Sequence, residues 1–180
     1  MRNKQKGFSL IELLIVVAII LIIAAIAIPN LIRSRMAANE ASSVACLRTL
    51  TTAFISYSTT YGNGLPPNLN VLQNPTTATA QADCDHAGLV DAVLAGLPPG
   101  TNTTFKKSGY QFTYIPGGAA LTPPVLVPPC SNGGFPTSQV TSLPLSVGGT
   151  GQRGFLVDNS GIIYFSTNGT TPVPGTSPVL

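Results

Sequence analysis

The feature that most constrains the fold is an apolar run from Phe8 to Ile28, whose only charged residue is Glu12. The run has 21 residues, and as an α-helix it would be roughly 30 Å long, which matches the hydrocarbon core of a bilayer. Three basic residues precede it, and the positive-inside rule keeps that end in the cytoplasm. The sequence therefore predicts one membrane-spanning helix, with the rest of the chain outside the cytoplasm.

A cleavable secretory signal peptide is the main alternative, because Ala25-Ile26-Ala27 has the small residues of a signal-peptidase site. The apolar run is longer than the roughly 7 to 15 residues of such a signal's apolar region. An acidic residue as early as Glu12 would also weaken targeting. A retained helix is therefore the favoured interpretation.

The charge balance argues against nucleic acid as a partner. Lysine and arginine number 9 against 6 acidic residues, but Arg2, Lys4 and Lys6 all precede Gly7. Without that end the chain is formally neutral, and no basic field remains. The composition is 44% hydrophobic and only 8% charged, so part of the apolar surface is expected to contact lipid or another chain.

Residues 6–12, Lys-Gly-Phe-Ser-Leu-Ile-Glu, followed by the apolar run and Pro29, form a specific motif. It resembles the prepilin cleavage and methylation motif of type IV pilins and type II secretion pseudopilins. The resemblance implies that a prepilin peptidase cuts after Gly7 and that the new amino group of Phe8 is methylated. It also implies that copies polymerise through their N-terminal helices, with help from an inner-membrane assembly platform and its ATPase.

Glu12 has a physical role to play in such an assembly. An acid inside lipid costs on the order of 3 kcal/mol unless it is paired. Cleavage after Gly7 would place a cationic amino group on Phe8, one helical turn or about 6 Å away, in the same helix or a neighbouring one. We therefore interpret Glu12 as an assembly residue whose partner appears on cleavage; the alternative is that its side chain extends to the lipid headgroups.

Pro29 ends the apolar block, and the pattern beyond it favours a kinked continuation over a stop. One apolar stripe recurs at helical spacing and is made of Val44, Leu47, Leu50, Thr51, Phe54, Tyr57 and Tyr61. Gly62 and Gly64, followed by two prolines, predict the end of the helix near Tyr61. The second half of the helix is therefore expected to lie on a folded head.

The head is predicted to be a small antiparallel sheet. Residues 110–114 alternate in polarity, and residues 154–157 and 162–165 flank a turn at Asp158-Asn159-Ser160-Gly161. Residues 139–147 are expected to add an edge strand, broken by Pro144. The fold class is thus α+β, a long helix packed on an antiparallel sheet, as in pilins. The N-terminal segments are expected to be a leader at 1–7, a membrane helix at 8–29 and an amphipathic half of the same helix at 30–61. Residues 62–104 are expected to form a loop that contains a short helix near 87–94. A sheet at 105–167 and a flexible end at 168–180 complete the chain.

Three cysteines allow three single bridges. An exported head lies in an oxidising compartment, where a bridge between Cys84 and Cys130 would restrain long loops. We favour that pair over any bridge to Cys46, although sequence alone does not fix the connectivity.

No cofactor is predicted. Asp83-Cys84-Asp85-His86 reads as a turn-rich loop rather than a zinc site, which needs three or four ligands. Asp158 is a weak candidate calcium ligand, because calcium needs six or more oxygens and Asp158 is the only acid of its turn. No catalytic constellation is evident either.

We therefore predict a structural subunit of a type IV pilus-type filament, rather than an enzyme. The precursor would span the bacterial inner membrane, and the assembled form would be an extracellular pilus. A pseudopilin of a type II secretion system, in a periplasmic pseudopilus, is the alternative. An exported binding or enzymatic domain with an N-terminal anchor is a third, and it would need a site in the head.

Overall fold

The computed structural model describes residues 8–74, 82–96, 103–122, 130 and 133–180. The chain divides into two compact units, Met1–Arg35 and Met36–Leu180. The predicted leader at residues 1–7, including Gly7, lies outside the described residues.

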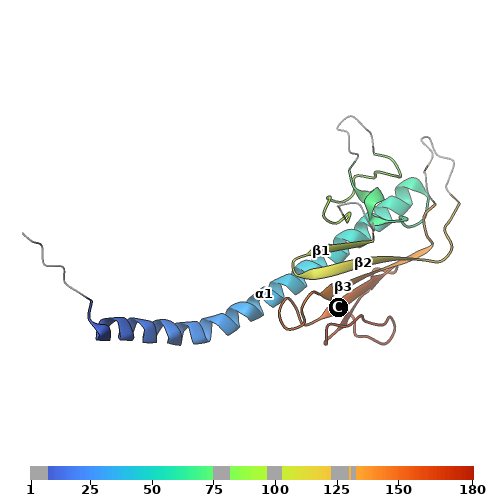
Figure 1. Ribbon diagram of the computed structural model, residues 1–180. Coiled ribbons are helices and arrows are strands. Elements are labelled where there is room, and N and C mark those ends of the chain that lie inside the picture. The colour runs from blue at the N-terminus through green and yellow to red at the C-terminus, as the bar shows by residue number, and fades with distance from the viewer. Residues whose placement is uncertain (1–7, 75–81, 97–102, 123–129, 131–132) are drawn as a thin grey trace, which may run out of the picture. The chain divides into compact units, whose positions relative to one another are not determined.

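Helix α1, Leu10–Tyr61, contributes to both units (Figure 1). It runs through Pro29, so the predicted continuation beyond the proline is observed. Its end also agrees with the prediction, because Gly62 has φ +61. Glycine adopts this left-handed conformation without steric cost, and it commonly follows the last helical residue.

In the described part of the head, five antiparallel strands form one sheet, in the order β1-β2-β3-β4-β5. They are β1 Thr104–Lys107, β2 Tyr110–Gly117, β3 Thr137–Pro144, β4 Gly154–Asp158 and β5 Ile163–Ser166. The α+β class is therefore confirmed. The edge position expected for residues 139–147 is wrong, because β3 pairs with strands on both sides. Pro144 is tolerated there because it is the last residue of the strand.

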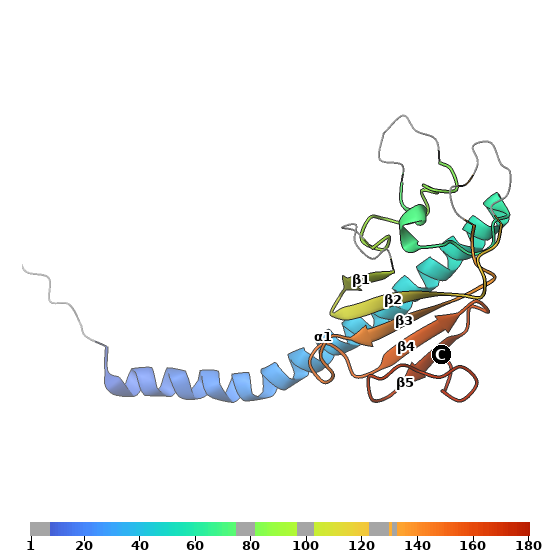
Figure 2. The ribbon, with the colours of Figure 1, turned by 45° about the vertical axis from the view of Figure 1, so that its right-hand side comes forward.

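The core of the head lies between the sheet and the second half of α1, and the strands lie side by side along that half of the helix (Figure 2). Leu47, Leu50 and Tyr57 of the helix are fully buried. From β2, Phe112 and Tyr114 face them, and the Tyr114 ring lies 5.2 Å from that of Phe54. The predicted stripe thus forms the helix side of the core, which also buries Glu40, Ser43 and Cys46.

The short helix expected at residues 87–94 is absent: that stretch forms turns. The backbone N–H groups of Ala87, Gly88 and Val90 donate to carbonyls of residues 71–73, and these bonds hold the segment against that part of the chain. Instead, a 3-10 helix forms at Leu69–Leu72, and the Asn68 side chain caps it. An apolar run of eight residues was too short to distinguish these outcomes.

The C-terminal segment also differs from the flexible end expected at residues 168–180. Phe165 of β5 donates its N–H to the Pro178 carbonyl, and Leu180 donates to the Ile163 carbonyl, both at 2.9 Å. These two bonds attach the segment to the free side of β5, where unpaired strand groups would otherwise face solvent.

Candidate functional site

The candidate site for assembly is the apolar first part of α1. All of its large side chains from Leu10 to Ile32 are exposed, at 44–77% of their full area. An 18-residue window of this helix has mean hydropathy 3.3, so the helix is long and apolar enough to cross a membrane. The part of the chain that the structure describes offers this surface no cover, so the cover has to come from lipid or another molecule.

Glu12 has a partner within its own chain. The backbone N–H of Ser9 donates to Glu12 Oε2 at 2.9 Å, and the N–H of Ile11 donates to Ser9 Oγ at 3.4 Å. This is a capping box, which satisfies N–H groups at the start of the helix. The pattern Ser-x-x-Glu at residues 9–12 was the sequence signal for it. The carboxylate therefore has a hydrogen-bond donor in its own chain that our sequence-based interpretation did not include, and its role in assembly stays a prediction.

The other two residues predicted to matter in this segment are Phe8 and Pro29. Phe8 precedes the helix and is 81% exposed, and Pro29 is inside the helix. Glu12 is three residues from Ser9, so its carboxylate lies at the end of the helix from which Phe8 extends. This placement suits a contact with an amino group on Phe8, of this copy or a neighbouring one.

A second charged group, missed from the sequence, ties the head to α1. Glu40 is only 8% exposed. Its Oε1 accepts the N–H groups of Gln152 at 2.9 Å and Arg153 at 3.1 Å, and its Oε2 accepts Arg153 Nε at 2.7 Å. The signal was available, because Glu40 is the only acid between residues 30 and 61 and lies seven residues before Leu47, on the same helix face.

The Glu40 cluster continues on both sides of the ion pair. The Arg153 guanidinium lies over the rings of Phe155 and Phe165, at 5.6 and 5.7 Å from their centroids. The neighbouring Asn39 donates to the Thr150 carbonyl at 2.8 Å. The segment between β3 and β4 is thus held to α1 by side chains of the helix, which fixes the sheet against it.

Replacing Glu40 by alanine is expected to destabilise the head by about 2–3 kcal/mol, because two backbone N–H groups lose their acceptor and Arg153 loses its partner. Burial by itself raises the pKa of Glu40, but the three hydrogen bonds outweigh it, so that pKa lies below its ordinary value. The stabilisation is therefore present above the unfolded pKa of about 4.3 and is lost as the pH falls through the lower folded value. Denaturant unfolding over a pH series measures it.

The control is Glu40→Gln, which keeps an oxygen for the backbone donors but carries no charge. It should be less destabilising than Glu40→Ala and should flatten the acid limb of the stability profile. An unaltered acid limb in Glu40→Gln would contradict the assignment.

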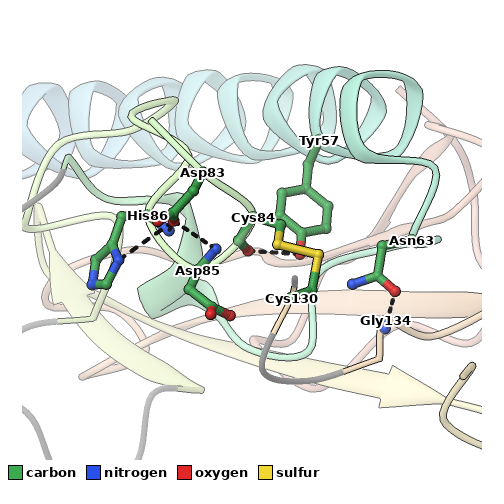
Figure 3. The surroundings of a disulfide bond; sticks show 8 residues. All are labelled: Tyr57, Asn63, Asp83, Cys84, Asp85, His86, Cys130 and Gly134. Carbon is green, nitrogen blue, oxygen red and sulfur yellow. Dashed lines mark hydrogen bonds and ion pairs between the residues drawn. A yellow bond between two sulfur atoms is a disulfide. The ribbon is translucent and has the colours of Figure 1, made fainter. Parts of the chain in front are cut away.

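In the loop region of the head, Cys84 and Cys130 form a disulfide with Cα atoms 5.5 Å apart, and Cys46 is free and buried (Figure 3). This is the pairing that we favoured from the sequence. The Tyr57 hydroxyl donates to the Cys84 carbonyl at 2.9 Å, so the bridge is also attached to α1.

Asp83 organises the loop before the bridge, as predicted for a turn-rich segment. Its Oδ1 accepts the N–H groups of Asp85 at 2.9 Å and His86 at 2.7 Å (Figure 3). The carboxylate is used in this turn, and so is that of Asp158, which accepts the N–H of Ser160 at 3.0 Å. Among the described residues, no group of three or more His, Cys, Asp or Glu side chains is placed to hold a metal ion.

Known proteins resemble part of the chain. A family model, the prokaryotic N-terminal methylation motif, matches residues 2–28. The type IV major pilin protein PilA of Myxococcus xanthus is 34% identical over 113 residues, which are 57% of this chain and 51% of that protein. The type IV wide pilus major component PilA4 of Thermus thermophilus is 65% identical over 40 residues, which are 22% of this chain and 30% of that protein.

The chain thus spans about half the length of the first relative and less than a third of the second. No solved structure gave a significant match. The family model covers the motif around Gly7 and the apolar part of α1, and the head has the expected antiparallel sheet. The chain thus carries the prokaryotic N-terminal methylation motif and is similar, over part of its length, to two major components of type IV pili.

Proposed function

We propose that the chain is the precursor of a structural pilin. The first part of α1 anchors it in the inner membrane, with the head outside the cytoplasm. A prepilin peptidase cuts after Gly7 and methylates the amino group of Phe8. The mature subunit then polymerises with copies of itself into a type IV pilus-type filament, aided by an assembly platform and its ATPase.

The observation that carries the proposal is the contrast between the two halves of α1. From Glu40 to Tyr57 the helix buries one face in its own head, whereas from Leu10 to Ile32 every large apolar side chain is exposed. Such a surface is stable in lipid, because the helix satisfies its own backbone groups. Outside lipid it needs an equally apolar cover, and identical helices from other copies provide one.

Glu12 gives this packing a register. In a bundle of apolar helices, sliding one helix along another costs little, but a single buried polar contact is satisfied at one position only. A pair between Glu12 of one copy and the Phe8 amino group of another would fix that position. The capping bond from Ser9 uses Oε2, so Oε1 remains for a second donor.

The relatives favour a pilus over a secretion pseudopilus, since both are described as major components of type IV pili. A secretion pseudopilin stays the alternative. A catalytic role has no support from the described residues: Glu40 forms an ion pair, His86 contacts Asp83, and the carboxylates of Glu12, Asp83, Asp91 and Asp158 accept backbone N–H groups of caps and turns.

Mass determination of the mature amino terminus tests the processing step. We expect the purified membrane or filament form to begin at Phe8 and to carry one additional methyl group. A terminus near Ile28 would instead show removal as an ordinary signal peptide, and an intact leader would show that no processing occurs. Substituting Gly7 by a bulky residue should leave the precursor uncut in the membrane.

A further inference from the structure

The sequence contains three Asn-Gly pairs, at residues 63–64, 132–133 and 168–169. Asparagine before glycine is chemically reactive, because glycine offers no side chain to hinder attack by its backbone nitrogen on the preceding amide. The structure places two of these asparagines in opposite environments: Asn168 is exposed in the turn after β5, whereas Asn63 is 1% exposed. Asn132 lies outside the described residues.

The turn at Asn168 orients the side-chain amide of this residue. The Thr170 hydroxyl donates to Asn168 Oδ1 at 2.7 Å, and the Thr170 N–H donates to the same oxygen at 3.4 Å. An Asx turn of this kind holds the side-chain carbonyl over the next peptide unit. Both donors also draw electrons from the amide carbon and stabilise negative charge on the oxygen during attack.

The attacking nitrogen is available as well. Gly169 is partly exposed, and none of the hydrogen bonds found in the described part of the chain is donated by its N–H. Gly169 has φ +71, a conformation that glycine adopts without steric cost, so the turn is held without backbone strain.

We propose that Asn168 is a site of spontaneous modification. Solvent base removes the Gly169 N–H proton, and the nitrogen attacks Asn168 Cγ. The bond from Cγ to Nδ2 then breaks, and the side-chain nitrogen leaves as ammonia, which takes up a proton. Water opens the resulting succinimide at either carbonyl, and the products are aspartate and isoaspartate. The only co-reactant is water, and each event adds one negative charge to the surface of the head.

Asn63 is the internal control, because the same pair is protected there. Its Oδ1 accepts the Gly134 N–H at 3.1 Å, inside the head. A side chain Cβ at Gly64 would meet the Phe135 carbonyl oxygen at 2.8 Å, so the backbone is tightly enclosed. Reaction at Asn63 therefore requires local opening of the head, which lowers the reactive population.

Modification of Asn168 would change the backbone of the turn as well as its charge. The turn packs closely, since a Cβ on Gly169 would lie 2.5 Å from Val147 Cγ2. Isoaspartate inserts an extra backbone carbon at this point, between β5 and the segment that returns to pair with it. Preparations of the head are thus expected to become heterogeneous with age at one defined position.

The test is incubation of the purified full chain in detergent, in neutral and mildly alkaline buffer, followed by peptide mass mapping that separates aspartate from isoaspartate. We expect Asn168 to lose its amide at least about tenfold faster than Asn63, with both products formed and a rate that rises with hydroxide concentration. Asn168→Gln, which cannot form the five-membered ring, should show no such change at this position. Thr170→Val, which lacks the hydroxyl donor, should react several-fold more slowly than Thr170→Ser.

Three results would overturn the proposal. They are an unchanged amide at Asn168 under alkaline conditions, loss at Asn63 that is as fast as at Asn168, and a glycan on Asn168 Nδ2. The last has to be examined because Asn168-Gly169-Thr170 also has the Asn-x-Thr acceptor pattern, and a glycosylated nitrogen would no longer leave as ammonia.

Discussion

Substitution of Glu12 by alanine is expected to abolish filaments while the processed subunit stays in the membrane. In the assembled state, the Phe8 amino group would lose its counter-charge in an apolar surrounding, at a cost on the order of 3 kcal/mol for each contact between copies. This corresponds to a roughly hundredfold weaker contact. Because a filament repeats the contact at every subunit, the loss should be complete in electron micrographs of sheared surface material.

The capping box makes matched controls necessary, because Glu12→Ala also removes the acceptor for the Ser9 N–H. Ser9→Ala removes the hydroxyl that accepts the Ile11 N–H but leaves the Glu12 charge, and it should retain filaments. Glu12→Gln keeps an oxygen for the cap and loses the charge, and it should fail to assemble. If Glu12→Gln assembles normally and Ser9→Ala does not, then helix capping, and not the ion pair, is what assembly requires.

The first part of the chain was largely predictable from sequence because one physical constraint dominates it. An unbroken apolar run of membrane length has few alternatives to a helix. The end of the helix at Tyr61 was equally predictable, because the signal is local: Gly62 and Gly64 favour a backbone conformation that other residues avoid. The capping partner of Glu12 was missed, although Ser9 lies three residues away, because the acid was considered only with its expected partner in the assembly.

The errors in the head have a common cause, which is that long-range pairing decided the outcome. Ala87 and Val90 donate hydrogen bonds to the 3-10 helix at Leu69–Leu72, some 16 and 18 residues earlier in the chain, and no local pattern predicts that choice over a helix. Glu40 finds Arg153 more than a hundred residues later. The hairpin at Asp158 was correct because its turn chemistry is local, with Gly161 donating back to the Asp158 carbonyl at 3.0 Å.

The disulfide between Cys84 and Cys130 joins two distant segments of the head covalently. Its removal is expected to cause the second large loss of stability or assembly. The two residues are 46 apart in sequence, and the segment between them contains β1 and β2. Closing a loop of this length removes chain entropy from the unfolded state worth about 4 kcal/mol. For a domain of this size, such a loss lowers the melting temperature by roughly 10 °C.

The double variant Cys84→Ser with Cys130→Ser should show this loss of stability in denaturant or thermal unfolding. The unfolding is monitored by near-ultraviolet circular dichroism of the tyrosines, because the chain has no tryptophan. Tyr57 is the sensitive probe, because its ring is fully buried and its hydroxyl bonds to the Cys84 carbonyl.

Cys46→Ala is the matched control for the bridge. Burial raises the pKa of the Cys46 thiol, which keeps it protonated and slow to exchange with a disulfide. Its replacement removes only a small buried group and should cost about 1 kcal/mol. Because the bridge acts on the unfolded chain and Cys46 acts only through packing, the two effects should add. A Cys46→Ala variant as unstable as the double variant, or a non-reduced peptide map with Cys46 in the bridge, would show that the wrong pair stabilises the head.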